Sequence, residues 1–506
     1  MRRRDVLLGA AVLALSGTGT WPRNPAMAQT DKPTRFDAQT VRQLARELAM
    51  KPFAAPDQQL PSDLNELSYD QYRNIRFNQD RSLWRGQGTP FEAQLLHRGF
   101  LFRDRVDIYT VAQGEARRIE YTPGLFRFEH GITAPDPKLD LAFSGFRLHS
   151  PINRPDYFDE VAVFQGASYF RALGKDQVYG TSARGLAIKT ADAAGEEFPV
   201  FKAFWIEDPR PGVDSVVVHA LLDSPSAAAA HRFTIRPGAS TVMAVEMTLY
   251  PRVDVDKAGL AALTSMFMFG PNDRDGIDDF RPMVCDANGL AIVTGTGERL
   301  WRPLANPQRL QISSFESTNI RGFGLMQRQR SFFDYQDLEA RYERRPSVWV
   351  EPIGDWGDGA VHLVEIPTPE EVHDNIVAYW RPKEPFRKGR EYAFTYRLHW
   401  GWDSPDSSDL GRFGQTRIGG TGERRQFVLD LVGDTIKNLP PENITARVTA
   451  NTGQVSNIVL QRNPEIEGWR LAFAFEPKGA DVAELRAEML RGEERLSESW
   501  VYRWTA

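Results

Sequence analysis

Short runs of alternating apolar residues, each ended by Gly, Pro, Asn or Asp, dominate this chain and limit the folds open to it. The runs are rich in Val, Ile, Tyr and Phe, and few helical segments separate them. They include "RVDIYTV", "SVVVHALL", "TVMAVEMTLY", "EYAFTYRLHW" and "QFVLDLV". Such spacing predicts antiparallel sheets packed as sandwiches rather than a parallel βαβ sheet. The predicted fold class is therefore all-β.

Two segments have helical spacing of apolar residues. In residues 36–50, Val41, Leu44 and Leu48 recur on one face, which predicts a helix there. Residues 480–492, "ADVAELRAEMLRG", are a second helix candidate, with a strand as the alternative.

The length of 506 residues exceeds one ordinary core and predicts two or three domains. A stretch rich in Ser, Asp and Pro at 403–409 is typical of a linker. We therefore expect a large β-sandwich at 33–402 and a smaller sandwich of immunoglobulin-like size at 410–506.

The first 28 residues have the pattern of an export signal. Arg3 and Arg4 precede a short apolar run, and Ala26 and Ala28 supply small residues for cleavage before Gln29. The arginine pair is typical of a twin-arginine signal, and the apolar run is too short to span a membrane. We expect a periplasmic protein, with an uncleaved N-terminal anchor as the alternative.

Charge and motif content exclude several function classes. The net charge is −5, from 62 basic and 67 acidic residues, so no nucleic-acid partner is expected. The eight histidines lack zinc-site spacing, and no phosphate loop or serine nucleophile motif occurs. The acidic run at 272–279 lacks the glutamate of a calcium loop, and Cys285 is the single cysteine. No metal and no cofactor are predicted.

A group of acidic residues stands before one of the predicted strands. In "EEVHDNIVAYW", residues 370–380, Asp374 precedes the apolar run that begins at Ile376. An aspartate here is either the cap of a turn or a catalytic acid at the rim of a sheet. Twelve tryptophans and scattered carboxylates permit a carbohydrate-active site, because sugars pack on aromatic rings and glycoside hydrolysis uses two carboxylates.

Several long segments, in the same order along the chain, resemble the glucan biosynthesis protein G and D family of Gram-negative bacteria. The resemblance extends from about residue 36 to the C-terminus. It is carried by "GASYFRALGKDQVYGTSARGLAI", "LTSMFMFGPN", "RPLANP", "RGFGLMQRQRSFFDYQD", "RRPSVWVEPIGDWGDG" and "VEIPTPEEVHDNIVAYW".

The resemblance implies a fold, a location and a substrate. The fold is a large galactose-mutarotase-like β-sandwich followed by a small immunoglobulin-like β-sandwich. The function is a role in osmoregulated periplasmic glucan biosynthesis, on a β-1,2-linked glucan. Family members include inverting endo-β-1,2-glucanases, so an endoglucanase or related transglycosylase is expected.

The family's functional residues map onto matching positions of this sequence. The aspartate of its "E-x-x-D-N-I" motif, the general acid, is Asp374. Glu371, three residues earlier, is a substrate-binding candidate, with a surface charge as the alternative. The general base, in an "RP-x-x-H-D" motif, corresponds to Asp286 of "RPMVCD". Tyr342 and Arg345 are expected to contact substrate or the path of the attacking water.

Two further residues are substrate-binding candidates with structural alternatives. Arg184 is a candidate sugar contact or a buried ion-pair partner, and Trp349 is a candidate subsite or a core residue. The sequence departs from the family pattern at two places close to Asp286: Cys285 replaces a histidine, and "TGTGE" at 294–298 replaces "G-N-G-E".

Three function classes remain open at this point. The first is a glucan hydrolase or transglycosylase. The second is a non-catalytic glucan-binding factor that works with a membrane glucosyltransferase. The third is a carbohydrate epimerase, which rests on fold alone.

Overall fold

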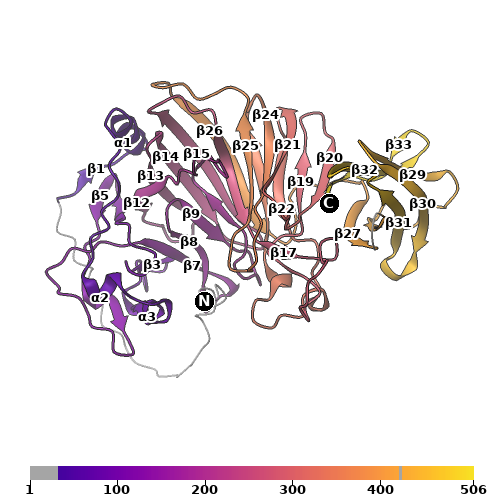
Figure 1. The fold of residues 1–506 in the computed structure, drawn as a ribbon. Helices are drawn as coiled ribbons and strands as arrows, with labels where there is room; N and C mark the ends of the chain where they lie inside the picture. Colours follow the sequence, from indigo (N-terminus) through magenta and orange to yellow (C-terminus); the bar gives the residue numbers. More distant parts are fainter. Residues whose placement is uncertain (1–31, 421–423) are drawn as a thin grey trace. The chain divides into compact units, whose positions relative to one another are not determined.

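The computed structural model describes residues 32–420 and 424–506, which form almost entirely β-structure (Figure 1). The predicted all-β class is confirmed. The export signal at 1–28 lies outside the described residues. The described chain has two compact units: residues 32–262 with 384–400, and residues 263–383 with the described part of 401–506. The linker expected at 403–409 falls inside the second unit.

The first unit holds one long sheet and one shorter sheet. The long sheet has the order β1 (Thr34–Arg35), β5 (Glu115–Arg118), β4 (Asp107–Ala112), β12 (Val200–Glu207), β13 (Val216–Asp223), β14 (Ala227–Arg236), β15 (Thr241–Pro251) and β26 (Tyr392–Gly401). The shorter sheet has the order β10 (Ser182–Arg184), β9 (Tyr169–Ala172), β8 (Tyr157–Gln165), β7 (Gly145–Arg154) and β3 (Glu92–Leu96).

Short elements complete this unit. They are α1 (Thr40–Ala49), α2 (Ser62–Asn65), α3 (Tyr69–Arg73), the paired β2 (Ile75–Phe77) and β6 (Phe126–Phe128), and β11 (Ala187–Ile188), which pairs with β16 (Ala258–Ser265). The predicted helix at 36–50 corresponds to α1. Its buried Val41 and Ala45 pack with Phe36, Trp205 and neighbouring residues in one core cluster.

The second unit contains a sheet that continues into the C-terminal strands. Its order is β23 (Ser347–Ile353), β22 (Gly322–Met326), β19 (Gly289–Val293), β20 (Arg299–Pro303), β34 (Ser499–Thr505), β32 (Val482–Arg491) and β29 (Ile444–Ala450), with β33 (Glu494–Arg495) beside β32. The helix considered for 480–492 is wrong, because this segment is the strand β32. Its alternate residues Ala483, Leu485 and Ala487 are buried on one face, which is the period of a strand.

Three smaller groups of strands belong to the same unit. They are β21 (Gln311–Thr318), β24 (Asp358–Glu365) and β25 (Ile376–Pro382); the pair β17 (Phe267–Phe269) and β18 (Val284–Cys285); and β27 (Arg412–Gly419), β28 (Arg425–Val432), β31 (Gly468–Glu476) and β30 (Gln454–Asn463).

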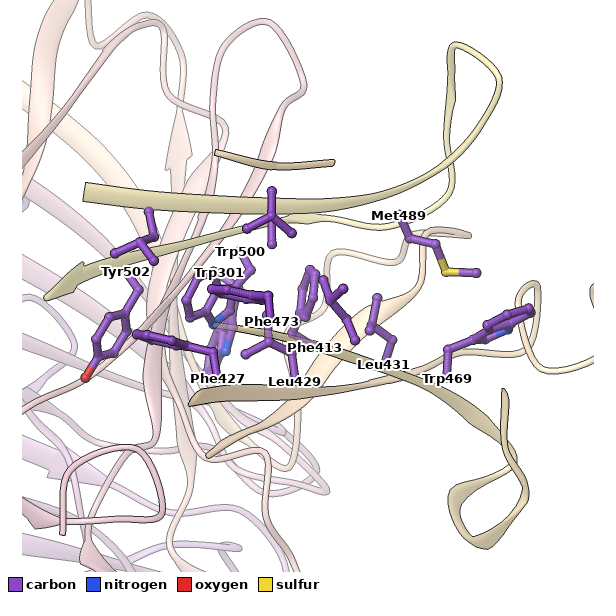
Figure 2. Close-up of a cluster of buried hydrophobic side chains, with 14 of the residues drawn as sticks. Trp301, Phe413, Phe427, Leu429, Leu431, Trp469, Phe473, Met489, Trp500 and Tyr502 are labelled. Carbon is purple, nitrogen blue, oxygen red and sulfur yellow. The ribbon is translucent and has the colours of Figure 1, made fainter. Parts of the chain in front are cut away.

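A single apolar core joins the C-terminal strands to the rest of the second unit. Figure 2 shows aromatic side chains of β27, β28, β31 and β34 gathered with Trp301 of β20. Trp349 and Met326 belong to the same cluster. Arg328 adds a polar connection, because its guanidinium lies 3.5 Å from the Trp301 ring centroid and hydrogen-bonds both oxygens of Glu498.

Among the helices of the described chain, none combines the length and the apolar character needed to cross a lipid bilayer.

Candidate functional site

Asp374 lies at the end of a closed loop, directly before β25. The loop is closed by the backbone N–H of Ile366, which donates to the carbonyl of Asn375 at 2.8 Å. Inside the loop, Thr368 Oγ1 lies 2.9 Å from His373 Nδ1. Asp374 is half-buried, between an exposed His373 and a buried Asn375. Asp374 therefore lies at the start of a buried strand, as the sequence predicted.

The segment at Met266 and Phe267 links this loop to Asp286. The Asn375 side chain accepts from the N–H of Phe267 and donates to its carbonyl, both at 2.9 Å. The backbone N–H of Asp286 donates to the carbonyl of Met266 at 2.8 Å. Two consecutive residues thus hold the Asp374 loop and the Asp286 turn, which are 88 residues apart in the sequence.

Asp286 forms a buried ion pair with Arg345. The Asp286 residue is 5% exposed, and its Oδ1 accepts a hydrogen bond from Arg345 Nη1. Burial alone lowers the pKa of Arg345, but the nearby Asp286 carboxylate offsets this effect and the net pKa is raised. The pair therefore keeps a fixed cation beside the Asp286 carboxylate.

Tyr342 connects this ion pair to Glu371. The Arg345 guanidinium lies 4.4 Å from the Tyr342 ring centroid, and the Tyr342 hydroxyl donates to Glu371 Oε2 at 3.2 Å. Burial raises the pKa of Tyr342 well above its ordinary value, so the hydroxyl keeps its proton and remains a donor. Four of the sequence-predicted residues, Asp286, Arg345, Tyr342 and Glu371, thus form one continuous chain of contacts.

Arg281 extends the chain, although sequence reasoning did not select it. Its Nη1 lies 2.8 Å from Glu371 Oε2 and 2.9 Å from Asp337 Oδ2, and its Nε and Nη2 contact both oxygens of Asp279. Burial opposes the charge of Arg281, but these carboxylates raise its pKa. Arg281 is the first residue of the quoted segment "RPMVCD", and Asp337 is the last residue of "RGFGLMQRQRSFFDYQD". Their positions in these two segments were the signal that could have found them.

Three large exposed apolar side chains lie close in the sequence to residues of this network. Phe280 is 79% exposed, Phe333 77% and Leu338 77%. Phe280 and Leu338 adjoin the two partners of the Arg281–Asp337 ion pair in the sequence, and Phe333 belongs to the same loop as Leu338. We call Phe280, Phe333 and Leu338 the apolar rim.

Cys285, which stands where the resemblance implies a histidine, is a neutral buried thiol. Burial, reinforced by the Asp286 charge, raises its pKa, and its Sγ accepts a hydrogen bond from Asn288 Nδ2 at 3.4 Å. The thiol therefore supplies no titrating group beside Asp286 near neutral pH. In the second segment that departs from the family pattern, "TGTGE" at 294–298, Glu298 ion-pairs with Arg486 and Arg495 of the C-terminal strands.

The last two sequence-predicted residues have other surroundings. Arg184 belongs to the first unit, where its Nη1 ion-pairs with Glu196 at 2.5 Å and its guanidinium lies over the Tyr169 ring. Trp349 is 3% exposed in the core of the second unit. It packs on Gly322 so closely that a Cβ there would lie 2.3 Å from the indole ring. We therefore leave Trp349 out of the site.

Within residues 32–420 and 424–506, no group of three or more His, Cys, Asp or Glu side chains is arranged to hold a metal ion. The network of Asp286, Arg345, Tyr342, Glu371 and Arg281 is instead a set of fixed hydrogen-bond donors and carboxylates. Such a set suits a neutral ligand with many hydroxyl groups.

The comparison with protein families matches residues 36–504 to the model described as "Periplasmic glucan biosynthesis protein, MdoG". Among curated proteins, the chain is 56% identical to glucans biosynthesis protein G of Bradyrhizobium diazoefficiens, over 100% of both chains. It is 49% identical to the protein of the same name from Vibrio cholerae serotype O1, over 99% of this chain and 96% of that one. Glucans biosynthesis protein G 1 of Shewanella oneidensis is 50% identical over 95% of this chain and 89% of its own length.

Among solved structures, a galactose mutarotase related enzyme from Lactobacillus acidophilus matches 47% of this chain and 96% of that chain, at 8% identity. The TM-score is 0.20, and we draw no argument from this likeness.

Proposed function

Because the chain belongs to the family of periplasmic glucan biosynthesis proteins described as MdoG, we propose that it acts in the periplasm on the β-1,2-linked backbone of a glucan. We propose the reaction to be an inverting endo-β-1,2-glucanase cleavage or a related transglycosylation. Asp374 is the general acid and Asp286 the general base.

One observation carries this proposal: the Asp374 loop and the Asp286 turn are both hydrogen-bonded to the Met266–Phe267 segment. An inverting hydrolase needs two carboxyl groups at fixed positions on opposite sides of the scissile bond, with room for one water. Because the Asp374 loop and the Asp286 turn are both hydrogen-bonded to Met266 and Phe267, both carboxyl groups are held at fixed positions.

The proposed step assigns each proton. Asp374 donates its proton to the glycosidic oxygen as the bond to the anomeric carbon breaks. Water attacks that carbon from the opposite face, and Asp286 accepts the water's proton. The products are two glucan chains, and the new reducing end has the inverted anomeric configuration.

The surrounding residues have supporting roles in this proposal. Arg345 fixes the position of the Asp286 carboxylate, and Tyr342 and Arg281 fix Glu371, which accepts a hydrogen bond from a sugar hydroxyl. Phe280 of the apolar rim packs against the C–H face of a glucose ring. Glucan is then the ligand of the site, and no cofactor takes part.

The Asp286 environment favours one alternative, a non-catalytic glucan-binding factor that works with a membrane glucosyltransferase. Asp286 is 5% exposed and bonded to a buried guanidinium, while the neighbouring Cys285 thiol is neutral. A base must reach water, and these contacts restrict its access. The same contacts would suit a carboxylate that orients a bound sugar.

The experiment that separates the two functions uses the full-length protein and linear β-1,2-glucan. Chain length of the products is followed by chromatography, and their anomeric form by NMR during the first turnovers. Shortened chains with an inverted new reducing end support the glucanase. Longer as well as shorter chains support transglycosylation. Saturable binding with no change in chain length supports the binding factor, and absence of both binding and turnover contradicts the proposal.

A further inference from the structure

The first unit contains a hollow that none of the candidate site residues lines. Its volume is about 320 Å³, at the small end of ligand pockets. The lining comes from α1, the segment at 55–57 and strands β4, β12 and β13. The lining residues include Leu44, Arg105, Asp107, Tyr109, Lys202 and Trp205.

The apolar wall of the hollow is a stack of aromatic rings. Trp205 stacks on Tyr109 with centroids 5.1 Å apart and ring planes 12° apart, and on Phe36 at 6.0 Å. Trp205 is buried between its two neighbours, whereas Tyr109 is half-buried and lines the hollow. A rigid ring that lies on another ring is a flat apolar surface of the kind that packs against the C–H face of a sugar.

The polar wall offers both donors and acceptors. Arg105 contacts Asp107 at 3.0 Å and Asp140 at 2.8 Å. Lys202 Nζ has longer contacts, 3.3 Å to the carbonyl of Ala54 and 3.4 Å to Asp223, and an ammonium carries three donors. The carboxylates beside these cations disfavour an anion as ligand. A neutral ligand with several hydroxyl groups fits the wall better.

We propose that this hollow is a second glucan-binding site, which holds one or two glucosyl units of the chain and takes no part in the reaction. Tyr109 packs against a sugar ring, and Lys202, Arg105 and Asp107 bind its hydroxyl groups. The inference rests on the proposed function, because it takes the glucan as the ligand of the protein.

The test measures amide hydrogen exchange of the full-length protein with increasing concentrations of linear β-1,2-glucan. The substitutions Asp286→Asn and Asp374→Asn are included so that the ligand is not consumed. We expect slower exchange at residues 53–59, which form the coil beside the hollow. Lys202→Ala removes a charged donor, so half-maximal protection of 53–59 should need about tenfold more glucan. Leu44→Trp, which fills the hollow from α1, should abolish the protection.

Lys257→Ala is the matched control. Lys257 is an exposed lysine of the same unit that ion-pairs with Asp192 and does not line the hollow. This variant should show the unaltered glucan dependence. Inorganic phosphate, a small anion, should give no protection at 53–59, and protection by phosphate without protection by glucan would overturn the assignment of a neutral saccharide.

Exchange at 281–288 and 366–375, in the candidate site, distinguishes failure of this inference from failure of the proposed function. Protection of 281–288 and 366–375 without any change at 53–59 would leave the candidate site intact and refute the second site. Absence of protection at all three segments would refute both. Protection at 53–59 that persists unchanged in Lys202→Ala and Leu44→Trp would also refute the hollow as the binding place.

Discussion

The side-chain amide of Asn375 makes two hydrogen bonds with one residue, Phe267, whose N–H and carbonyl it contacts at 2.9 Å each. The Asn375 side chain thus makes the pair of hydrogen bonds to Phe267 that a neighbouring strand would otherwise make. Asn375 directly follows Asp374, and Phe267 pairs across β17 and β18 with Cys285, which directly precedes Asp286. One buried amide therefore links the segment of the proposed acid to the strand pair that leads to the proposed base.

Replacement of Asn375 should disturb both stability and catalysis. Asn375→Ala leaves the buried N–H and carbonyl of Phe267 without these partners, so we expect a loss of about 2–4 kcal/mol in the free energy of unfolding. Denaturant unfolding measures this loss. Turnover should fall more than glucan affinity, since the acid is displaced but the other sugar contacts remain. Equal turnover per folded molecule in the variant would contradict the positioning role.

Removal of either proposed catalytic carboxyl group should abolish most of the turnover. Asp374→Asn and Asp286→Asn preserve shape, and each should reduce kcat by about 10²–10⁴ while glucan still binds. Initial rates on linear β-1,2-glucan and calorimetric binding provide the two readouts. Near-full activity in Asp374→Asn would show that this aspartate only caps the loop.

The apolar rim should contribute to affinity rather than to stability. Phe280 is almost wholly exposed, so Phe280→Ala should leave the free energy of unfolding nearly unchanged. The loss of ring packing should raise KM or Kd for glucan about two- to tenfold. Ile458→Ala is a matched control, because Ile458 is 44% exposed on β30 of the C-terminal strands. An equal effect in both variants would show that the rim has no specific role.

Cys285 should be chemically inert in the folded protein. Its side chain is fully buried and burial raises the pKa of its thiol, so little reactive thiolate is present at pH 8. A disulfide reagent should label it only after unfolding in denaturant. Rapid labelling of the native protein would mean that the space beside Asp286 is open to solvent, and would weaken the binding-factor alternative.

Titration of the Asp273 carboxyl group should lower the free energy of unfolding as pH rises. Burial raises its pKa from 3.8 to about 6, although the N–H of Asn306 at 2.7 Å partly offsets the effect. A carboxyl whose pKa is higher in the folded state stabilises the fold while it is protonated. This contribution is complete below about pH 4 and is lost as pH rises through 6, at a cost of about 3 kcal/mol.

Asp273→Asn removes this titration and can still accept the hydrogen bond from Asn306. The variant should be more stable than the parent at pH 7.5, and the difference should disappear near pH 4. Thermal unfolding at several pH values measures the difference. A stability difference that does not change with pH would show that the carboxyl group ionises normally.

The sequence allowed the all-β class and the strand after Asp374 to be predicted because side-chain alternation is a local property. The segment at 480–492 shows the limit of that method. Its Ala, Leu, Glu and Met residues favour a helix, but pairing with β29 and β34 and burial of alternate residues against Trp500 and Phe473 make it a strand. Tertiary packing overrides local preference there.

The site was predictable as a set of motifs but not as a network. Asp286, Tyr342, Arg345 and Glu371 were each selected from separate segments, and the structure places them in one chain of contacts. Arg281 was missed because an arginine that bridges three carboxylates resembles any other arginine in the sequence. Trp349 was selected for its ring chemistry, and only its packing on Gly322 reveals that the ring is inaccessible.

Trp301, Trp349 and the C-terminal aromatic residues share one core. This core limits which truncations and chimeras of the protein can fold. A truncation near residue 402 would uncover the face of β20, β22 and β23 that now lies against Phe413, Phe427 and Trp500. It would also leave Arg328 without Glu498. Residues 410–506 are therefore not an accessory that can be exchanged between homologues as a cassette. Chimeras of related proteins should inherit residues 263–383 and 401–506 from one parent.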